Sequence, residues 1–130
     1  MTIEGTAYAQ GSFGSVLTSG SGTMGDISIQ VVINKWDGAT ETQIASGESQ
    51  SISVAGEADF LIPITIPKST FKAGDTLRLT MEIVKVGGSG GVWSVYYGND
   101  PLNRDGTYLT PSSDSTTTQT KITIPFKIDL

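Results

Sequence analysis

Apolar and polar residues alternate with a period of two in several stretches of this chain, most regularly in the last one. From Lys121 to Leu130 every even position is apolar, and every odd position is polar or proline. This period is that of a strand with one face in a core and the other in water. The pattern predicts a strand over residues 122–130, with its even-numbered side chains buried and its last residue held on the buried face.

Alternation of the same kind predicts long strands over residues 27–36, 58–66 and 76–86. The positions expected to face the core are Ile27, Ile29, Val31, Ile33, Ala58, Phe60, Ile62, Ile64, Ile66, Leu77, Leu79, Met81 and Ile83. Pro63 and Pro67 have no backbone N–H to donate, so their strand is expected at a sheet edge or with these amide positions facing outward. Pro125 carries the same implication for the last strand.

Shorter elements are read from turn residues and from β-branched or aromatic runs. Asp37-Gly38 is a strong turn signal, and residues 40–45 are expected to return from it as the second strand of a hairpin. A second turn is expected over residues 46–48, then a strand over 50–54. Val92–Tyr97 is aromatic and β-branched, which favours a strand. Residues 98–111 are expected to form a polar loop, and residues 112–120 a linker into the last strand.

The first 25 residues show a weaker pattern. Residues 2–9 are expected to form a weak strand or an extended arm. Residues 11–25 are rich in Gly and Ser, which favours a loop or short irregular strands. The alternative is an N-terminal arm over residues 1–25 that reaches across a neighbouring subunit.

These elements predict an all-β fold, because no helical period persists over ten residues. About seven to nine strands separated by turns indicate an antiparallel β-sandwich, jelly-roll-like or immunoglobulin-like in topology. An immunoglobulin domain proper is excluded, since the chain has no Cys. At 130 residues the chain is expected to form one domain with a core of its own.

The amino-acid composition excludes several classes of catalytic and metal site. The chain has neither Cys nor His, which excludes thiolate zinc sites, iron–sulfur clusters, cysteine nucleophiles and Ser-His-Asp triads. Its formal net charge of -5, without basic clusters, argues against nucleic acid as a partner. Neither a signal-peptide pattern nor an apolar run long enough to cross a bilayer is present, so no membrane partner is expected. The prediction is a protein that is not an enzyme and needs no cofactor.

Two groups of residues with side-chain oxygens are candidate sites. Asp100, Asn103 and Asp105 offer hard oxygen ligands of the kind that calcium prefers. The same residue types are ordinary turn formers, and a turn is favoured over a calcium site. Asp59 and Glu82 lie on predicted strands and would be the candidates for a glycosidase pair. Both fall on polar faces, so solvated carboxylates are favoured.

The aromatic residues suggest a second alternative. Trp36, Trp93, Tyr96 and Tyr97 could form a platform on which sugar rings stack, as in a non-catalytic carbohydrate-binding module. Trp36, beside the Asp37-Gly38 turn, is the candidate expected to be more exposed. Core or interface packing is favoured for the group.

Five segments taken in order resemble a known family. They are KWDG at 35–38, TETQIAS at 40–46, IPKSTFKAGDTLRLTMEI at 66–83, NDPLNRD at 99–105 and KITIPFKIDL at 121–130. Their order resembles the small jelly-roll-like β-sandwich proteins of tailed-bacteriophage virions, such as capsid decoration (cement) proteins and head-fibre modules. The resemblance covers residues 27–130 and lies in pattern rather than in a defining motif.

The resemblance implies a structural protein that is assembled in the host cytoplasm and located in the virion. Its partners would be the major capsid protein or other virion proteins, and it would be a homotrimer without a cofactor. An interface is expected at apolar residues on nominally polar faces and at one exposed aromatic residue. These are Val32, Leu61, Val84, Val86 and Trp36. The alternative for the apolar positions is a second core layer between sheets.

Overall fold

The computed structural model describes residues 1–51, 56–97 and 120–128, and every regular element in them is a β-strand. The strands are β1 (Thr2–Ser19), β2 (Thr23–Trp36), β3 (Glu41–Glu48), β4 (Gly56–Thr70), β5 (Thr76–Ser89), β6 (Val92–Tyr97), β7 (Lys121–Thr123) and β8 (Phe126–Lys127). All their pairings are antiparallel. The predicted all-β antiparallel sandwich is therefore confirmed. Most of the strand expected over 50–54, and nearly all of the loop and linker expected over 98–120, lie outside the described residues.

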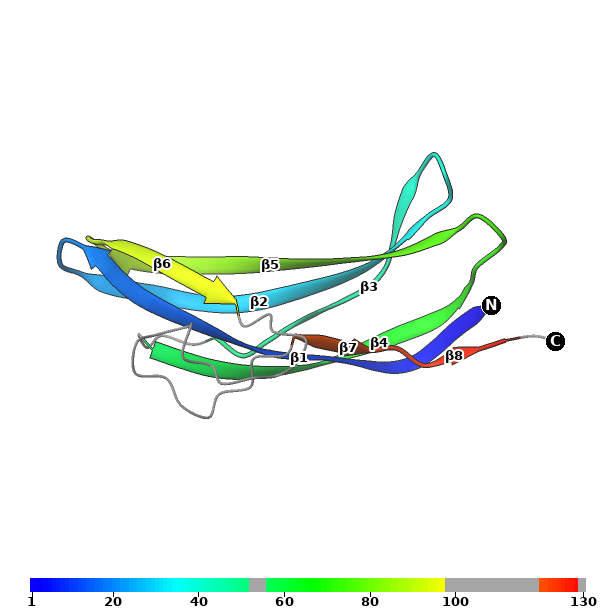
Figure 1. Cartoon of the computed structure of the whole chain (residues 1–130), viewed down its shortest axis with the longest axis horizontal. Helices are drawn as coiled ribbons and strands as arrows, with labels where there is room; N and C mark the ends of the chain where they lie inside the picture. Colours follow the sequence, from blue (N-terminus) through cyan, green and yellow to red (C-terminus); the bar gives the residue numbers. More distant parts are fainter. Residues whose placement is uncertain (52–55, 98–119, 129–130) are drawn as a thin grey trace.

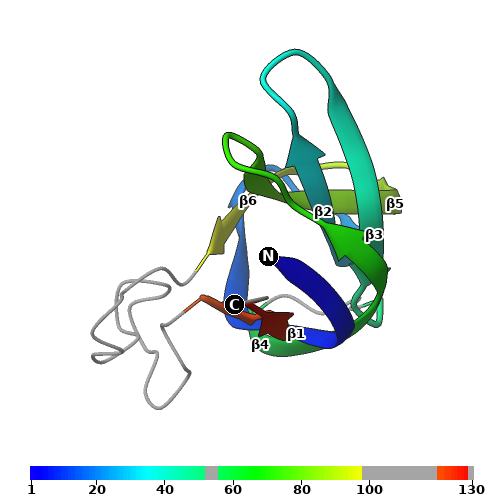
Figure 2. The same ribbon diagram turned by 90° about the vertical axis from the view of Figure 1, so that its right-hand side faces the viewer.

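The strands form two sheets that pack face to face (Figure 1). In the first, the β1 sheet, β1 is central: β4 pairs along one side, and β6, β7 and β8 pair in turn along the other. In the second, the β2 sheet, β2 lies between β3 and β5. Seen from one end, the strands surround a common interior (Figure 2).

The core lies between the two sheets, and the alternation predicted for β2 and β4 is confirmed there. Residues Ile27, Ile29, Val31 and Ile33 are at most 1% exposed, and Phe60, Ile62, Ile64 and Ile66 are at most 5% exposed. Burying one such side chain contributes roughly 1.5–3 kcal/mol, so these two strands supply much of the stabilising apolar area.

The prediction of a loop over residues 11–25 is wrong. Residues 11–19 complete β1, an 18-residue strand that is paired on both sides, and residues 23–25 begin β2. Phe13 is 1% exposed in the core. A Cβ added at Gly11 would lie 2.9 Å from the Phe60 ring, so this glycine leaves room for a core side chain. Within residues 11–25, glycine serves as a turn residue only in the short link at residues 20–22, where Gly20 has φ 79°.

The prediction of a turn over residues 46–48 is also wrong, because β3 continues to Glu48. Gly47 faces the β1 sheet, where an added Cβ would lie 2.8 Å from side-chain atoms of both Ile62 and Ile64. The glycine therefore marks a close approach of β3 to β4. The other turn prediction holds: Gly38 has φ 98°, and the Asp37 carboxylate accepts hydrogen bonds from the N–H groups of Ala39 and Thr40.

The continuous strand expected over residues 122–130 is replaced by β7 and β8, which are separated at Ile124 and Pro125. Proline has no N–H to give to a strand ladder, which accounts for a break at this point. Ile122 and Ile124 are half-buried against the core as predicted, but Phe126 is 61% and Ile128 65% exposed. The prediction for the chain's last residue falls outside the described part.

The edge position inferred from proline in β4 is confirmed. Among the described strands, β4 is hydrogen-bonded to β1 alone. Pro63 lies opposite Tyr8 and faces solvent, as does Pro67. A strand with a neighbour on each side would lose ladder hydrogen bonds at both prolines.

Candidate functional site

The two long sides of the sandwich are closed to different extents. On the closed side, β3 packs against β4, with Gly47 in contact distance of the isoleucines of β4. On the open side, β5 faces the short strands β6 and β7, and no hydrogen-bonded pairing of described strands joins them. An apolar pocket of about 130 Å³ lies there between the sheets. It is lined by Ala9, Gln10, Val31, Phe60, Leu79, Met81, Thr120, Lys121 and Ile122.

The open side leaves apolar side chains of β5 uncovered. Leu77, Leu79, Met81 and Ile83 were all expected in the core. Leu77 and Met81 do pack partly against it, but Leu79 is 43% and Ile83 is 37% exposed. The expectation is wrong for these two residues because β5 is an edge strand, and their side chains are only partly covered by the opposite sheet.

Polar atoms near β6 are also left without partners. Trp93 and Val95 pack against the core, as favoured from the sequence. The hydroxyl of Ser15, a residue that is 3% exposed, and the Nε1–H of Trp93 have no hydrogen-bond partner among the described residues. These residues lie on neighbouring positions of β1 and β6, since Ser15 pairs with Val95 and Leu17 with Trp93. The side chains of Tyr96 and Tyr97 lie outside the described part.

Trp36 lies at the end of β2, on the outer face of the β2 sheet, and is half-buried. The Arg78 guanidinium lies over its ring, 4.4 Å from the centroid, in a cation–π contact. The same guanidinium is 3.8 Å from a carboxylate oxygen of Glu41. One face of the Trp36 ring is therefore already occupied, which does not favour this residue as a sugar-stacking platform.

The expected interface residues are distributed over both sheets. Val32, Trp36 and Val84 lie on the outer face of the β2 sheet and are half-buried. Leu61 lies on the outer face of the β1 sheet and is 61% exposed. The backbone of Val86 pairs with that of Asp26, and its side chain lies outside the described part. One contact patch cannot contain Leu61 together with Val32 and Val84, because the two outer faces point in opposite directions.

Leu61 has apolar neighbours on its own face. It pairs with Gln10, and the next position along each strand on this face pairs Pro63 with Tyr8. Tyr8 is 47% exposed. Tyr8, Leu61 and Pro63 thus form an exposed apolar group, here called the Leu61 patch, on a rigid pair of strands.

The acidic residues that the structure describes do not converge on one site. Asp59 is exposed on the outer face of the β1 sheet, and Glu82 is exposed on the outer face of the β2 sheet, so they form no pair. Within residues 1–51, 56–97 and 120–128 no cluster of three acidic residues could hold a metal ion. The weaker calcium candidates Asp100, Asn103 and Asp105 lie outside these ranges.

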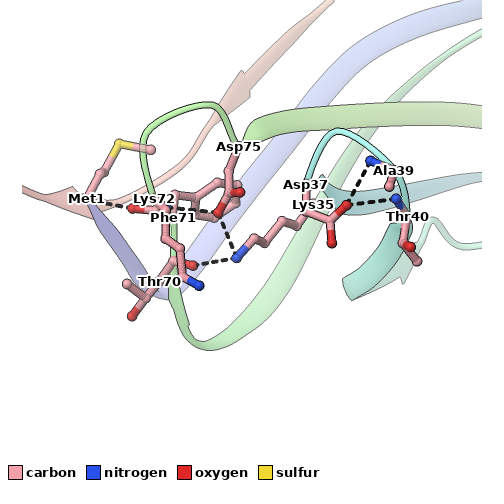
Figure 3. Close-up of polar contacts among 9 residues, drawn as sticks. All are labelled: Met1, Lys35, Asp37, Ala39, Thr40, Thr70, Phe71, Lys72 and Asp75. Atoms are coloured by element: carbon pink, nitrogen blue, oxygen red, sulfur yellow. Dashed lines mark hydrogen bonds and ion pairs between the residues drawn. The ribbon is translucent and has the colours of Figure 1, made fainter.

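One end of the sandwich is held by a polar cluster around Lys35 (Figure 3). The Lys35 ammonium is 2.8 Å from a carboxylate oxygen of Asp75 and donates to the carbonyl of Thr70 at 2.9 Å. It thereby links β2 to the end of β4 and to the β4–β5 turn. The Lys35 hydrogen bond, aided by the Lys72 N–H, lowers the pKa of Asp75 below its usual value. The backbone N–H groups of Thr40 and Ala39 lower the pKa of Asp37 in the same way.

In the part of the chain that the structure describes, no helix has the length and apolar character needed to cross a membrane. Comparisons of the chain with protein-family models, with curated proteins and with solved structures gave no match.

Proposed function

We propose that this protein is a non-catalytic structural component of a tailed-bacteriophage virion, which decorates or cements the capsid through protein–protein contacts. The order of sequence segments given above suggests this class of protein. The structural observation that supports it is the Leu61 patch. An exposed apolar group on the outer face of a well-packed sheet is typical of a protein-binding surface.

The patch suits this role for physical reasons. Tyr8 and Leu61 project from paired strands, so little backbone entropy is lost when they are covered. Pro63 is rigid and offers no N–H that would need a hydrogen-bond partner in a dry contact. The proposed occupant is the major capsid protein or another protein of the particle surface.

The test is whether the protein travels with particles. Particles from the source strain are purified on density gradients, and the protein is quantified in them by mass spectrometry. We expect it in a fixed ratio to the major capsid protein. Absence from the particles, with the protein present in the lysate, would contradict the proposal.

A pair of variants assigns the contact. Leu61→Asp puts a charge in the centre of the patch and is expected to lower occupancy on the particle by at least about tenfold, since a buried unpaired charge is costly. Thr65→Asp adds the same charge to an exposed position on the same face of β4 and is the matched control. Equal occupancy for both variants would exclude the Leu61 patch as the contact.

A further inference from the structure

We propose that the edge of β5 that no described strand pairs with is a self-association site, at which β5 of a second copy of this chain adds in antiparallel orientation. The two β2 sheets would then form one continuous six-stranded sheet. This inference does not depend on a role in virions.

The first argument is the character of the edges. β5 has 14 residues, contains no proline and is hydrogen-bonded to β2 alone among the described strands. The edge strand β4 carries Pro63 and Pro67, and the edge strand β3 has only 8 residues and packs beside β4. Natural proteins commonly protect exposed edges with prolines, bulges, short strands or charged residues, and of these devices β5 has charged residues at Arg78, Glu82 and Lys85. β5 has neither proline nor short length, and its pairing with β2 over residues 76–86 shows no register shift.

The second argument is charge complementarity in one register. When Thr80 lies opposite Thr80 of the second copy, Arg78 lies opposite Glu82 of the second copy, and Glu82 opposite Arg78 of the second copy. A shift by two residues in either direction loses both pairs. Arg78 and Glu82 are exposed on the same outer face, where opposite charges across strands are favourable.

The third argument is apolar coverage on the other face of β5. In the same register, Leu79 lies opposite Met81 of the second copy, and Ile83 lies opposite Leu77 of the second copy. Among the side chains of β5 that the structure describes, Leu79 and Ile83 are the large apolar ones that are exposed in the single chain. One register therefore pairs the charges on one face and covers the apolar residues on the other.

Arg78 already contacts Trp36 and Glu41, but these contacts leave it able to bind. Its side chain is 45% exposed, and its contact with Glu41 is long and exposed, which makes it weak. A guanidinium has five N–H donors around its edge, and a cation–π contact uses its face.

The experiment uses the full chain and charge reversal. Sedimentation velocity over a wide concentration range is expected to show a monomer–dimer equilibrium. Arg78→Glu places two pairs of carboxylates opposite each other, and Glu82→Arg two pairs of guanidinium groups. Each change alone is expected to weaken dimerisation by about tenfold or more, and the double variant Arg78→Glu/Glu82→Arg is expected to restore it.

Mixing the two single variants gives the sharpest result. In a mixed dimer both cross-strand pairs again join opposite charges, so the variants should bind each other although neither binds itself. Thermal unfolding of each variant shows that it is folded, and loss of the Trp36 contact does not account for rescue in the mixture. A strict monomer, a trimer, or a dimer insensitive to these changes would overturn the proposal.

Discussion

The closed and open sides of the sandwich differ in how completely the facing strands cover the apolar side chains between the sheets. At the closed side, β3 and β4 lie so close together that a methyl group at position 47 would collide with Ile62 and Ile64, and Gly47 has none. At the open side, Leu79 and Ile83 remain partly in water, and the Ser15 hydroxyl is buried without a described partner. The closed side therefore resembles the interior of a stable domain, and the open side resembles a surface that another chain can cover.

The largest expected difference comes from shortening one side chain on each side. Ile62→Ala, at a fully buried position facing β3, should lower the free energy of unfolding by about 2–5 kcal/mol. Leu79→Ala should cost less than about 1 kcal/mol, because this side chain already contacts water. Urea unfolding at a concentration where the protein is monomeric measures both. Similar losses would mean that the open side is as well packed as the closed one.

The closed side can also be tested by adding volume. Gly47→Ala puts a Cβ 2.8 Å from Ile62 and Ile64, and overpacking of this kind costs about 1–3 kcal/mol. The matched control is Ser46→Ala, at the neighbouring exposed position on β3, which should change stability by less than about 0.5 kcal/mol. If Gly47→Ala were as well tolerated as the control, β3 and β4 would have room to separate.

A smaller effect of opposite sign is expected at the open side. Ser15→Ala removes a buried hydroxyl that has no described partner, so stability should stay equal or rise by up to about 1 kcal/mol. Ser28 is equally buried, but its hydroxyl is hydrogen-bonded to the Glu48 carboxylate, so Ser28→Ala should destabilise by about 1 kcal/mol. Thermal or urea unfolding compares the two. A clear loss with Ser15→Ala would show that its hydroxyl is hydrogen-bonded.

The smallest effect concerns the end of the sandwich where the β4–β5 turn joins the two sheets. The pKa of Asp75 is lowered in the folded protein, so its contribution is present above its unfolded pKa and is lost as pH falls through the folded value. Asp75→Asn should therefore lower Tm at neutral pH, and this difference should close in acid. A difference that persists unchanged below about pH 4 would contradict the link to Lys35.

The strands that form the core were predictable because β-branched residues alternate in them without interruption. β2 and the buried face of β4 follow directly from their isoleucines, and the prolines of β4 placed it at an edge. The glycines of β1 and β3 led to the wrong predictions of a loop over residues 11–25 and a turn over residues 46–48. Gly11 and Gly47 lie in stretches whose residues are typical of turns. In the structure, Gly11 makes room for Phe60, and Gly47 makes room for the isoleucines of β4. Only knowledge of the opposite sheet distinguishes these two uses of glycine.

The candidate site was less predictable for a related reason. The sequence located an exposed leucine at position 61, because an apolar residue stood on a polar face. It could not show that Leu79 and Ile83 are exposed, since their alternation is the same as that of buried strands. Whether such a residue is covered depends on the length of the strand opposite, which in β6 and β7 is short.

The central place of β1 has a consequence for biosynthesis. β1 is made before every strand that pairs with it, and its hydrogen-bond partners stand at residues 56–70, 92–97 and 121–127. Its sheet cannot be completed until residue 127 has left the ribosome, and pairing over such separations is slow. During that interval an 18-residue strand is available to other nascent chains. Its glycines, which weaken local strand propensity, would then limit misassembly.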